Sequence, residues 1–208
     1  MNIHLIYGML GRGFREKRMR EFYRMFFLEP TTTVVDLGGS APTWKYSSFS
    51  PRVTIVNLDT EVNHDGFPMV CADAASCPFP DHSFDIAFSN SLIEHLGTWE
   101  NQQRLAKQIR CVAKGYYVQT PNKWFPVEPH YISPLVQFVP RRLRPWFIRW
   151  LTVWGWVTRP SKQECTRSCE EIRLLDAKEM AELFPEATIM RERFMGLTKS
   201  IIAVRIPS

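Results

Sequence analysis

The residues best placed to do chemistry are a carboxylate and two glycines, Asp36, Gly38 and Gly39, directly after a β-branched run. Thr and Val favour a buried strand, and a glycine pair lets the chain turn sharply beneath a ligand. A second strand-like run, 53–58, is followed by another acid, Asp59. A strand, a glycine turn and an acid after the next strand are typical of nucleoside binding, with the carboxylate accepting from the ribose hydroxyls. The pattern by itself also fits two ordinary strands of an α/β protein.

Three further motifs follow in order: Asp73-Ala74, the run Pro78-Phe79-Pro80-Asp81-His82-Ser83-Phe84-Asp85, and the pair Glu94-His95. Together with the first two motifs they make the chain resemble the class I S-adenosylmethionine-dependent methyltransferases, within the broad type 11 group, over roughly 33–120. The resemblance implies an α/β fold with a single Rossmann-like domain. Its sheet would be seven-stranded and mostly parallel with an antiparallel C-terminal hairpin strand, helices on both faces and a lid insertion after strand five.

The cofactor implied by the resemblance is S-adenosylmethionine. Its methionine carboxylate would accept backbone N–H groups of the glycine pair, and its ammonium would face Asp36. Asp59 would hold both ribose hydroxyls. The resemblance assigns Asp73 to the adenine amino group, the Ala74 backbone to a ring nitrogen, and Asn90 to the methionine part. The candidate cofactor residues are therefore Asp36, Gly38, Gly39, Asp59, Asp73, Ala74 and Asn90.

Two departures from the family pattern concern this site. Ser40, Ala41 and Pro42 stand where the usual third glycine is expected. Only thirteen residues separate Asp59 from Asp73, so the helix usually found there must be very short or absent.

Two of the cofactor candidates also have purely structural interpretations. Asp73 fits a turn residue before Pro78. Asn90 or Ser91 fits an N-cap of a short helical turn that begins at Leu92.

Methyl transfer requires alignment of a nucleophile with the S–CH₃ bond, and it needs a base only when the nucleophile carries a proton. Two histidines are the candidate catalytic residues. His130 lies on the predicted lid, with Glu128 as an orienting partner, and His95 follows strand four. The alternatives are that His95 packs a helix and that His130 only shapes its loop.

Periodicity and capping residues predict the elements that position these groups. An amphipathic helix is expected over 12–28, a second over 99–113 with Lys114-Gly115 as its C-terminal cap, and a third over 177–184 with Asp176 as N-cap. Strands are expected at 33–37, 53–58, 68–71, 84–89, 116–119, 187–194 and 199–206.

The predicted lid, 120–162, is rich in tryptophan and basic residues, with six basic residues and no acidic one between Tyr131 and Gln163. Its aromatic residues recur at helical spacing over 146–157. Core packing is the default interpretation of such a stripe. The rival is an interfacial helix, in which 141–157 contacts a membrane and the acceptor is linked to a lipid.

The composition supports one domain over 1–208, since 45% of its residues are hydrophobic, and the resemblance implies that it is a methyltransferase domain. We expect no signal peptide and no membrane-spanning helix, and hence a cytoplasmic protein or one peripheral at the inner membrane face. Its five cysteines are odd in number and scattered, which suits a reducing compartment. Cys165 and Cys169 have no companion ligand pair at the usual spacing, so no metal site is predicted.

The leading hypothesis is a methyltransferase that moves a methyl group to a small-molecule or lipid-linked acceptor by in-line displacement. A catalytically silent adapter is the non-enzymatic alternative, because no acid or base is obligatory for this chemistry. A nicotinamide oxidoreductase is the enzymatic alternative, although the first loop lacks Gly-x-Gly-x-x-Gly. No nucleic-acid partner is expected, since Ser89-Asn90-Ser91-Leu92 replaces the motif of nucleic-acid methyltransferases after strand four.

Overall fold

The central sheet of the computed structural model, which describes residues 3–46 and 49–207, has the strand order β3-β2-β1-β4-β5-β9-β8. Strands β1 to β5 run parallel, and β9 pairs antiparallel with both β5 and β8. The predicted seven-stranded, mostly parallel sheet with an antiparallel hairpin strand is confirmed. The strands are β1 (Thr33–Leu37), β2 (Arg52–Asn57), β3 (Met69–Cys71), β4 (Phe84–Asn90), β5 (Ala113–Pro121), β8 (Thr188–Phe194) and β9 (Leu197–Arg205).

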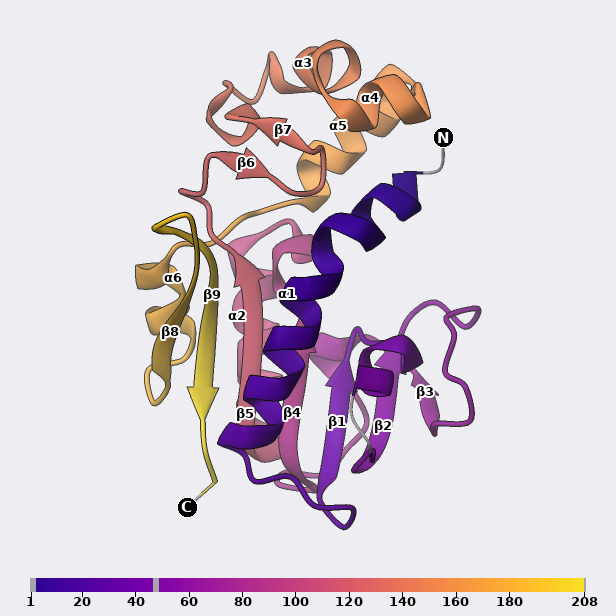
Figure 1. The fold of residues 1–208 in the computed structure, drawn as a ribbon, viewed down its shortest axis with the longest axis vertical. Coiled ribbons are helices and arrows are strands. Elements are labelled where there is room, and N and C mark those ends of the chain that lie inside the picture. The colour runs from indigo at the N-terminus through magenta and orange to yellow at the C-terminus, as the bar shows by residue number, and fades with distance from the viewer. Residues whose placement is uncertain (1–2, 47–48, 208) are drawn as a thin grey trace.

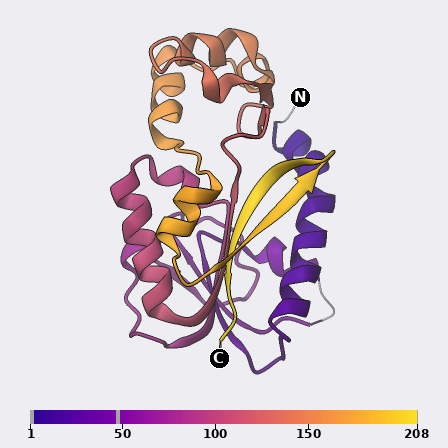
Figure 2. The same ribbon diagram turned by 90° about the vertical axis from the view of Figure 1, so that its left-hand side faces the viewer.

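Helices cover both faces of this sheet because successive strand residues point to opposite sides. Val35 and Leu37 face α2 (Trp99–Val112) and α6 (Ala177–Leu183), whereas Val34 faces the opposite cluster. That second cluster receives α1 (Ile3–Met25) and the 3₁₀ helix Ala41–Tyr46, so the sheet lies between two apolar layers (Figure 2).

Helix α1 is anchored by aromatic packing. The Phe22 ring lies 4.8 Å from that of Phe88 and 5.3 Å from that of Tyr117, between ring centroids. Both predicted bounds of this helix, 12 and 28, are wrong, because α1 spans Ile3–Met25. The chain leaves the helix after Met25, and Phe27 adopts a positive φ of 47° with an exposed side chain.

The predicted cap at Gly115 is also wrong, because α2 ends at Val112 and Gly115 already lies within β5. A Cβ atom at Gly115 would stand 2.6 Å from the carbonyl oxygen of Arg205 on β9. The glycine therefore permits close strand packing. The predicted capping box of α6 is confirmed: Asp176 and Glu179 each accept from the other's backbone N–H.

Residues 122–174, here called the insertion, rise above the carboxyl ends of the parallel strands (Figure 1). They pack around a small core of their own that includes Tyr131, Val136, Ile148 and Cys165. The elements are β6 (Val127–Glu128), β7 (Ser133–Pro134), the 3₁₀ helix Val136–Phe138, α3 (Arg144–Leu151), α4 (Val153–Thr158) and α5 (Lys162–Glu171).

The tryptophan-rich stretch forms two helices, so the single helix expected over 146–157 is wrong. Thr152 separates α3 from α4 in an extended conformation, and its hydroxyl accepts from Gly155 N at 2.9 Å. A threonine that can cap the next helix competes with continuation of the previous one. None of the described helices combines the length and apolar character that a bilayer crossing requires.

Candidate functional site

Four strands bring their candidate residues to one edge of the sheet. The carboxyl ends of β1, β2, β3 and β4 precede or carry Gly38, Asp59, Asp73 and Asn90 respectively. Because parallel strands end at the same edge, residues far apart in sequence meet beneath the insertion (Figure 1). The expectation of a very short or absent helix between Asp59 and Asp73 is borne out, since the described chain there passes directly from β2 to β3.

The glycine turn after β1 is fixed by backbone contacts. Gly38 has a φ of +74°, and its N–H donates to Val56 O at 2.8 Å. Gly39 is required by space: a Cβ atom there would stand 1.8 Å from Asp36 Oδ2. The Gly38 N–H is therefore engaged within the fold, and an incoming carboxylate has to be met by the N–H groups that follow.

Asp36 lies buried beneath this turn. Trp44 Nε1 donates to Asp36 Oδ2 at 2.8 Å. Burial raises the pKa of the Asp36 carboxyl to about 7, against the smaller lowering effect of the Trp44 hydrogen bond. Sequence reasoning missed Trp44, for which the only signal was a lone tryptophan soon after a glycine turn.

Asp59 and Asp73 are exposed carboxylates at the neighbouring strand ends. Asp59 Oδ1 accepts from Glu61 N at 2.9 Å. Asp73 caps the 3₁₀ helix Ala74–Ser76, accepting from Ala75 N at 2.9 Å, so its interpretation as a turn residue describes the observed geometry. Leu58, which sequence reasoning also missed, leaves 71% of its surface exposed beside Asp59.

Asn90, at the end of β4, is held by a buried arginine from α1. Arg18 Nη1 donates to Asn90 Oδ1 at 2.5 Å and to Gln119 Oε1 at 3.0 Å. Arg18 Nη2 pairs with Glu192 at 2.9 Å, and both of these side chains are almost fully buried. Ser91 donates its hydroxyl to Gln119, and Leu92 is the N-cap of the following 3₁₀ helix, so the N-cap interpretation of Asn90 or Ser91 is wrong.

The two candidate histidines meet across the gap between sheet and insertion. His95 lies on the 3₁₀ helix Ile93–Leu96 after β4, and His130 lies on the loop after β6. Their Nε2 atoms are 3.1 Å apart, and His130 Nδ1 lies 2.6 Å from Glu128 Oε1. The structure thus joins both predicted residues and the predicted orienting partner in one chain of contacts.

Glu94, which precedes His95 in the chain, is a further candidate functional residue. The sequence predicted no role for it and indicated it only as part of the Glu94-His95 motif. It is completely buried, and Thr120 Oγ1 donates to its Oε2 at 3.0 Å. Loss of hydration raises the pKa of Glu94. Desolvation and the neighbouring His130 lower the pKa of His95 to about 4. Desolvation also lowers the pKa of His130, but Glu128 and Glu94 together outweigh it, so the net shift is upward.

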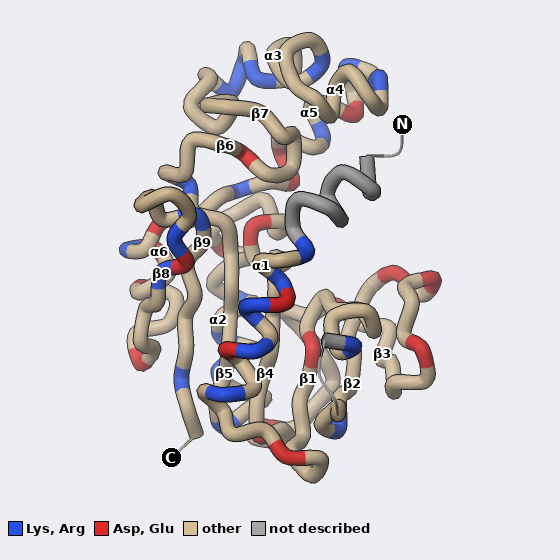
Figure 3. Tube along the Cα trace, in the orientation of Figure 1, with Lys and Arg blue, Asp and Glu red and all other residues tan. Residues whose placement is uncertain are grey.

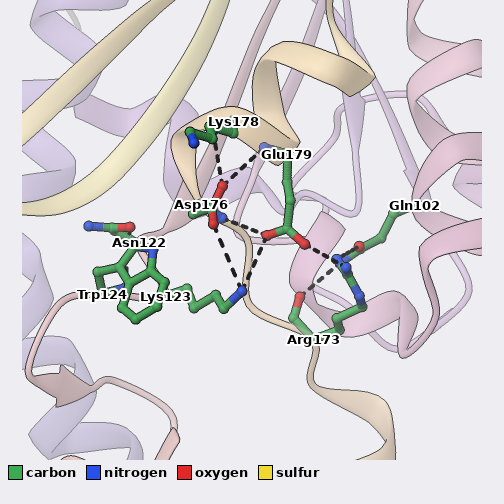
Figure 4. Close-up of polar contacts among 8 residues, drawn as sticks. All are labelled: Gln102, Asn122, Lys123, Trp124, Arg173, Asp176, Lys178 and Glu179. Atoms are coloured by element: carbon green, nitrogen blue, oxygen red, sulfur yellow. Dashed lines mark hydrogen bonds and ion pairs between the residues drawn. The ribbon is translucent and has the colours of Figure 1, made fainter. Parts of the chain in front are cut away.

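The root of the insertion is a polar cluster that holds its two chain ends together (Figure 4). Arg173 donates to Glu179 Oε1 and to Gln102 Oε1, both at 2.6 Å. Lys123 lies between Asp176 and Glu179, 3.8 and 3.9 Å from their carboxylates. The backbone N–H of Arg173 also donates to Glu94 O at 2.7 Å. This cluster therefore helps to position Glu94, His95 and His130, here called the histidine centre.

A cavity of about 220 Å³ opens beside Glu128, on the insertion side of the same centre. Its wall carries four basic residues and two acidic ones, together with apolar side chains. The charged lining residues are Lys123, Glu128, Arg141, Arg144, Arg173 and Glu179.

Comparison with known proteins gives one family match, over about a third of the chain. Residues 46–116 match the family model described as a methyltransferase domain. No curated protein matches the chain by sequence.

Solved structures share the fold over nearly the whole chain. The magnesium protoporphyrin IX methyltransferase of Synechocystis PCC 6803, solved with bound S-adenosylhomocysteine, superposes with a TM-score of 0.62 at 10% identity, covering 99% of this chain and 88% of that one. A SAM-dependent methyltransferase from Archaeoglobus fulgidus gives 0.58 at 13% identity, with 98% and 100% coverage. The sheet order and these similarities show that the chain has the fold of class I S-adenosylmethionine-dependent methyltransferases, and residues 46–116 match the model of a methyltransferase domain.

Proposed function

We propose that the protein transfers the methyl group of S-adenosylmethionine to a small-molecule acceptor bound between the sheet edge and the insertion. The observation that carries the proposal is the juxtaposition of two half-sites. The ends of β1 to β4 offer Gly39, Asp59 and Asn90 to a nucleoside-linked amino acid, and the histidine pair includes His95 from the short helix that follows β4 at the same edge. Proteins of the same fold that bind SAM or its product support this choice of cofactor.

The roles follow from the chemistry of each group. Asp59 accepts from the ribose hydroxyls, Asp73 and the Ala74 backbone meet the adenine, and the exposed Leu58 offers the base an apolar surface. Gly39 and Ser40 donate their backbone N–H groups to the methionine carboxylate, since the N–H groups of Gly38 and Ala41 are engaged within the fold. Asp36 compensates the ammonium charge from beneath the turn.

Transfer itself requires alignment and exclusion of water. The acceptor atom approaches the methyl carbon opposite sulfur, the new bond to the acceptor forms, and the S–C electron pair stays on sulfur to give S-adenosylhomocysteine. His130, oriented by Glu128, contacts the acceptor or takes its proton, with His95 beside it.

Calorimetric titration of the purified protein with S-adenosylmethionine, S-adenosylhomocysteine and NADH tests the proposal. We expect micromolar binding of the first two, about −8 kcal/mol, and none of NADH. Binding of NADH alone would support the oxidoreductase alternative. Absence of all binding would instead favour an adapter, and would show that the altered glycine loop no longer accepts the cofactor.

Cofactor affinity should rise with pH because of Asp36. Its pKa of about 7 in the folded protein means that it is protonated in mildly acidic solution and anionic above neutrality. A cationic ligand prefers the anion, so binding below pH 7 must release a proton. We expect S-adenosylmethionine affinity to increase roughly tenfold from pH 5.5 to 7.5. The Asp36→Asn variant should show a flat profile, and an equally steep profile in that variant would contradict the assignment.

The acceptor is, in this proposal, linked to a lipid and reached at a membrane surface. The insertion exposes Trp146, Trp150 and Trp156 to 61%, 52% and 64%, which rules out core packing for these three. Basic residues accompany them around α3 and α4 (Figure 3). Exposed tryptophans with arginines suit the headgroup region of an anionic membrane, such as the inner face of a cell membrane.

Replacing both Trp146 and Trp150 with serine is expected to reduce binding to anionic vesicles at least tenfold in a sedimentation assay. The fold should be retained, because both side chains are exposed and leave no cavity. Phe27→Ser is the matched control, since Phe27 is also exposed but follows the end of α1 that is remote from the insertion. Equal vesicle binding by the double variant and the control would contradict the membrane contact.

A further inference from the structure

Three potential metal ligands converge where sheet and insertion meet. A carboxylate oxygen of Glu94 and one ring nitrogen each of His95 and His130 lie within 4.8 Å of one another. The two Nε2 atoms are 3.1 Å apart. Two nitrogens bound to one ion at about 2.1 Å are separated by roughly 3.0–3.4 Å in octahedral or tetrahedral geometry. The observed spacing falls within this range, and it also fits a hydrogen bond between the two rings when no ion is bound.

The surroundings of His130 have the form of a support for a metal ligand. Its Nδ1 lies 2.6 Å from Glu128 Oε1, which keeps the proton on Nδ1 and turns the Nε2 lone pair toward His95. Glu128 is itself buried and accepts from Tyr131 N at 2.9 Å. A carboxylate behind the far nitrogen of an imidazole is the usual way of orienting a ligating histidine.

Glu94 supplies an independent observation. Its carboxylate is completely buried, and Thr120 satisfies Oε2, yet Oε1 has no hydrogen-bond partner among the described residues. An unpaired buried carboxylate oxygen is costly, and a bound cation satisfies it.

We propose that Glu94, His95 and His130 bind one divalent transition-metal ion, such as Zn²⁺, whose open positions take hydroxyl oxygens of the acceptor. Two imidazoles and one carboxylate are a common ligand set for such ions and leave room for substrate. The metal site cannot be recognised from the sequence because His95 and His130 are 35 residues apart and lie on different elements.

The consequence for the reaction rests on the proposed methyl transfer. With its Nε2 on the ion, His130 acts as a ligand and no longer takes the proton of the acceptor. An acceptor hydroxyl bound to the ion has a lowered pKa and loses its proton to solvent. The resulting oxygen anion attacks the methyl carbon, the O–C bond forms, and the S–C pair leaves with sulfur. The acceptor is then an oxygen nucleophile, and a pair of adjacent hydroxyls fits two open positions best.

Calorimetric titration of the chelator-treated full chain with ZnCl₂ tests the site without cofactor or acceptor. We expect one ion per chain with micromolar affinity or tighter. His95→Ala and His130→Ala should each weaken binding at least a hundredfold, and Glu128→Gln about 10- to 100-fold. His82→Ala, at an exposed histidine away from the centre, should leave binding unchanged. Circular dichroism establishes that the variants fold, and His95, the ligand with the largest solvent-accessible fraction of the three, gives the least disruptive variant.

Absence of stoichiometric binding, or full affinity in folded His95→Ala, overturns the site. Binding of Zn²⁺ without binding of S-adenosylmethionine leaves the metal site standing and removes the methyl-transfer proposal. Binding of S-adenosylmethionine without binding of Zn²⁺ removes the metal site and leaves the methyl-transfer proposal standing. For the acceptor, the visible spectrum of the Co²⁺-loaded protein should shift on addition of catechol and not of its dimethyl ether. An unchanged spectrum with catechol overturns the hydroxyl-binding role.

Discussion

Replacing Arg18 with methionine is expected to lower the free energy of unfolding by about 3–5 kcal/mol, measured by urea denaturation followed by circular dichroism. Methionine keeps most of the apolar stem but leaves the nearly buried Glu192 carboxylate without its partner at 2.9 Å. Asn90 and Gln119 lose the same donor. Removal of one member of a buried ion pair is costly because the other charge remains desolvated.

Arg167→Met is the matched control. Arg167 pairs with Glu171 at 2.7 Å on α5, but its side chain is 81% exposed, so we expect a change of about 0.5 kcal/mol or less. Arg18→Met with Glu192→Met should recover much of the lost stability, since no charge is then left buried. A loss in Arg18→Met no larger than in the control would contradict the role assigned to this network.

Replacing Asp59 with alanine is expected to weaken S-adenosylmethionine binding about a hundredfold or more, measured by calorimetry. The change removes two charge-assisted hydrogen bonds to ribose, each worth about 1.5 kcal/mol or more. Stability should change little, because the side chain is exposed and its main contact in the fold is with Glu61 N.

Glu61→Ala provides the control for local charge, since Glu61 contributes only its backbone N–H to Asp59. We expect cofactor affinity within about twofold of the original protein in this variant. Near-normal affinity in Asp59→Ala would remove the ribose assignment and with it the placement of the nucleoside at the end of β2.

The sheet could be predicted from sequence because its signals are local. Val34 and Val35 mark a buried strand, Gly38 marks the turn, and Asp176 with Glu179 marks a helix start, each within a few residues of the element it defines. The prediction of Gly115 as a helix cap was wrong because the need for glycine there arises from β9, about ninety residues away. The Arg205 carbonyl of that strand occupies the space that a side chain at residue 115 would need.

The polar centres could be predicted only in part. Arg18 lies among other charges on an amphipathic helix and looks solvent-facing until β8 brings Glu192 to it. His95 and His130 could each be predicted as candidate residues, but their contact depends on how the insertion packs against the sheet. Asp36 could be recognised by its motif, whereas its raised pKa depends on the burial that Trp44 completes.

The two ends of the insertion lie side by side: Asn122 and Leu175 form a parallel bridge, and Lys123 N–H donates to Leu175 O at 2.9 Å. A segment whose ends already meet can be lengthened, shortened or exchanged with little cost to the sheet that bears it. The region above the sheet is thus a module that can be exchanged on the platform formed by the strand ends. Because this module carries Glu128 and His130, such an exchange also removes the partner of His95.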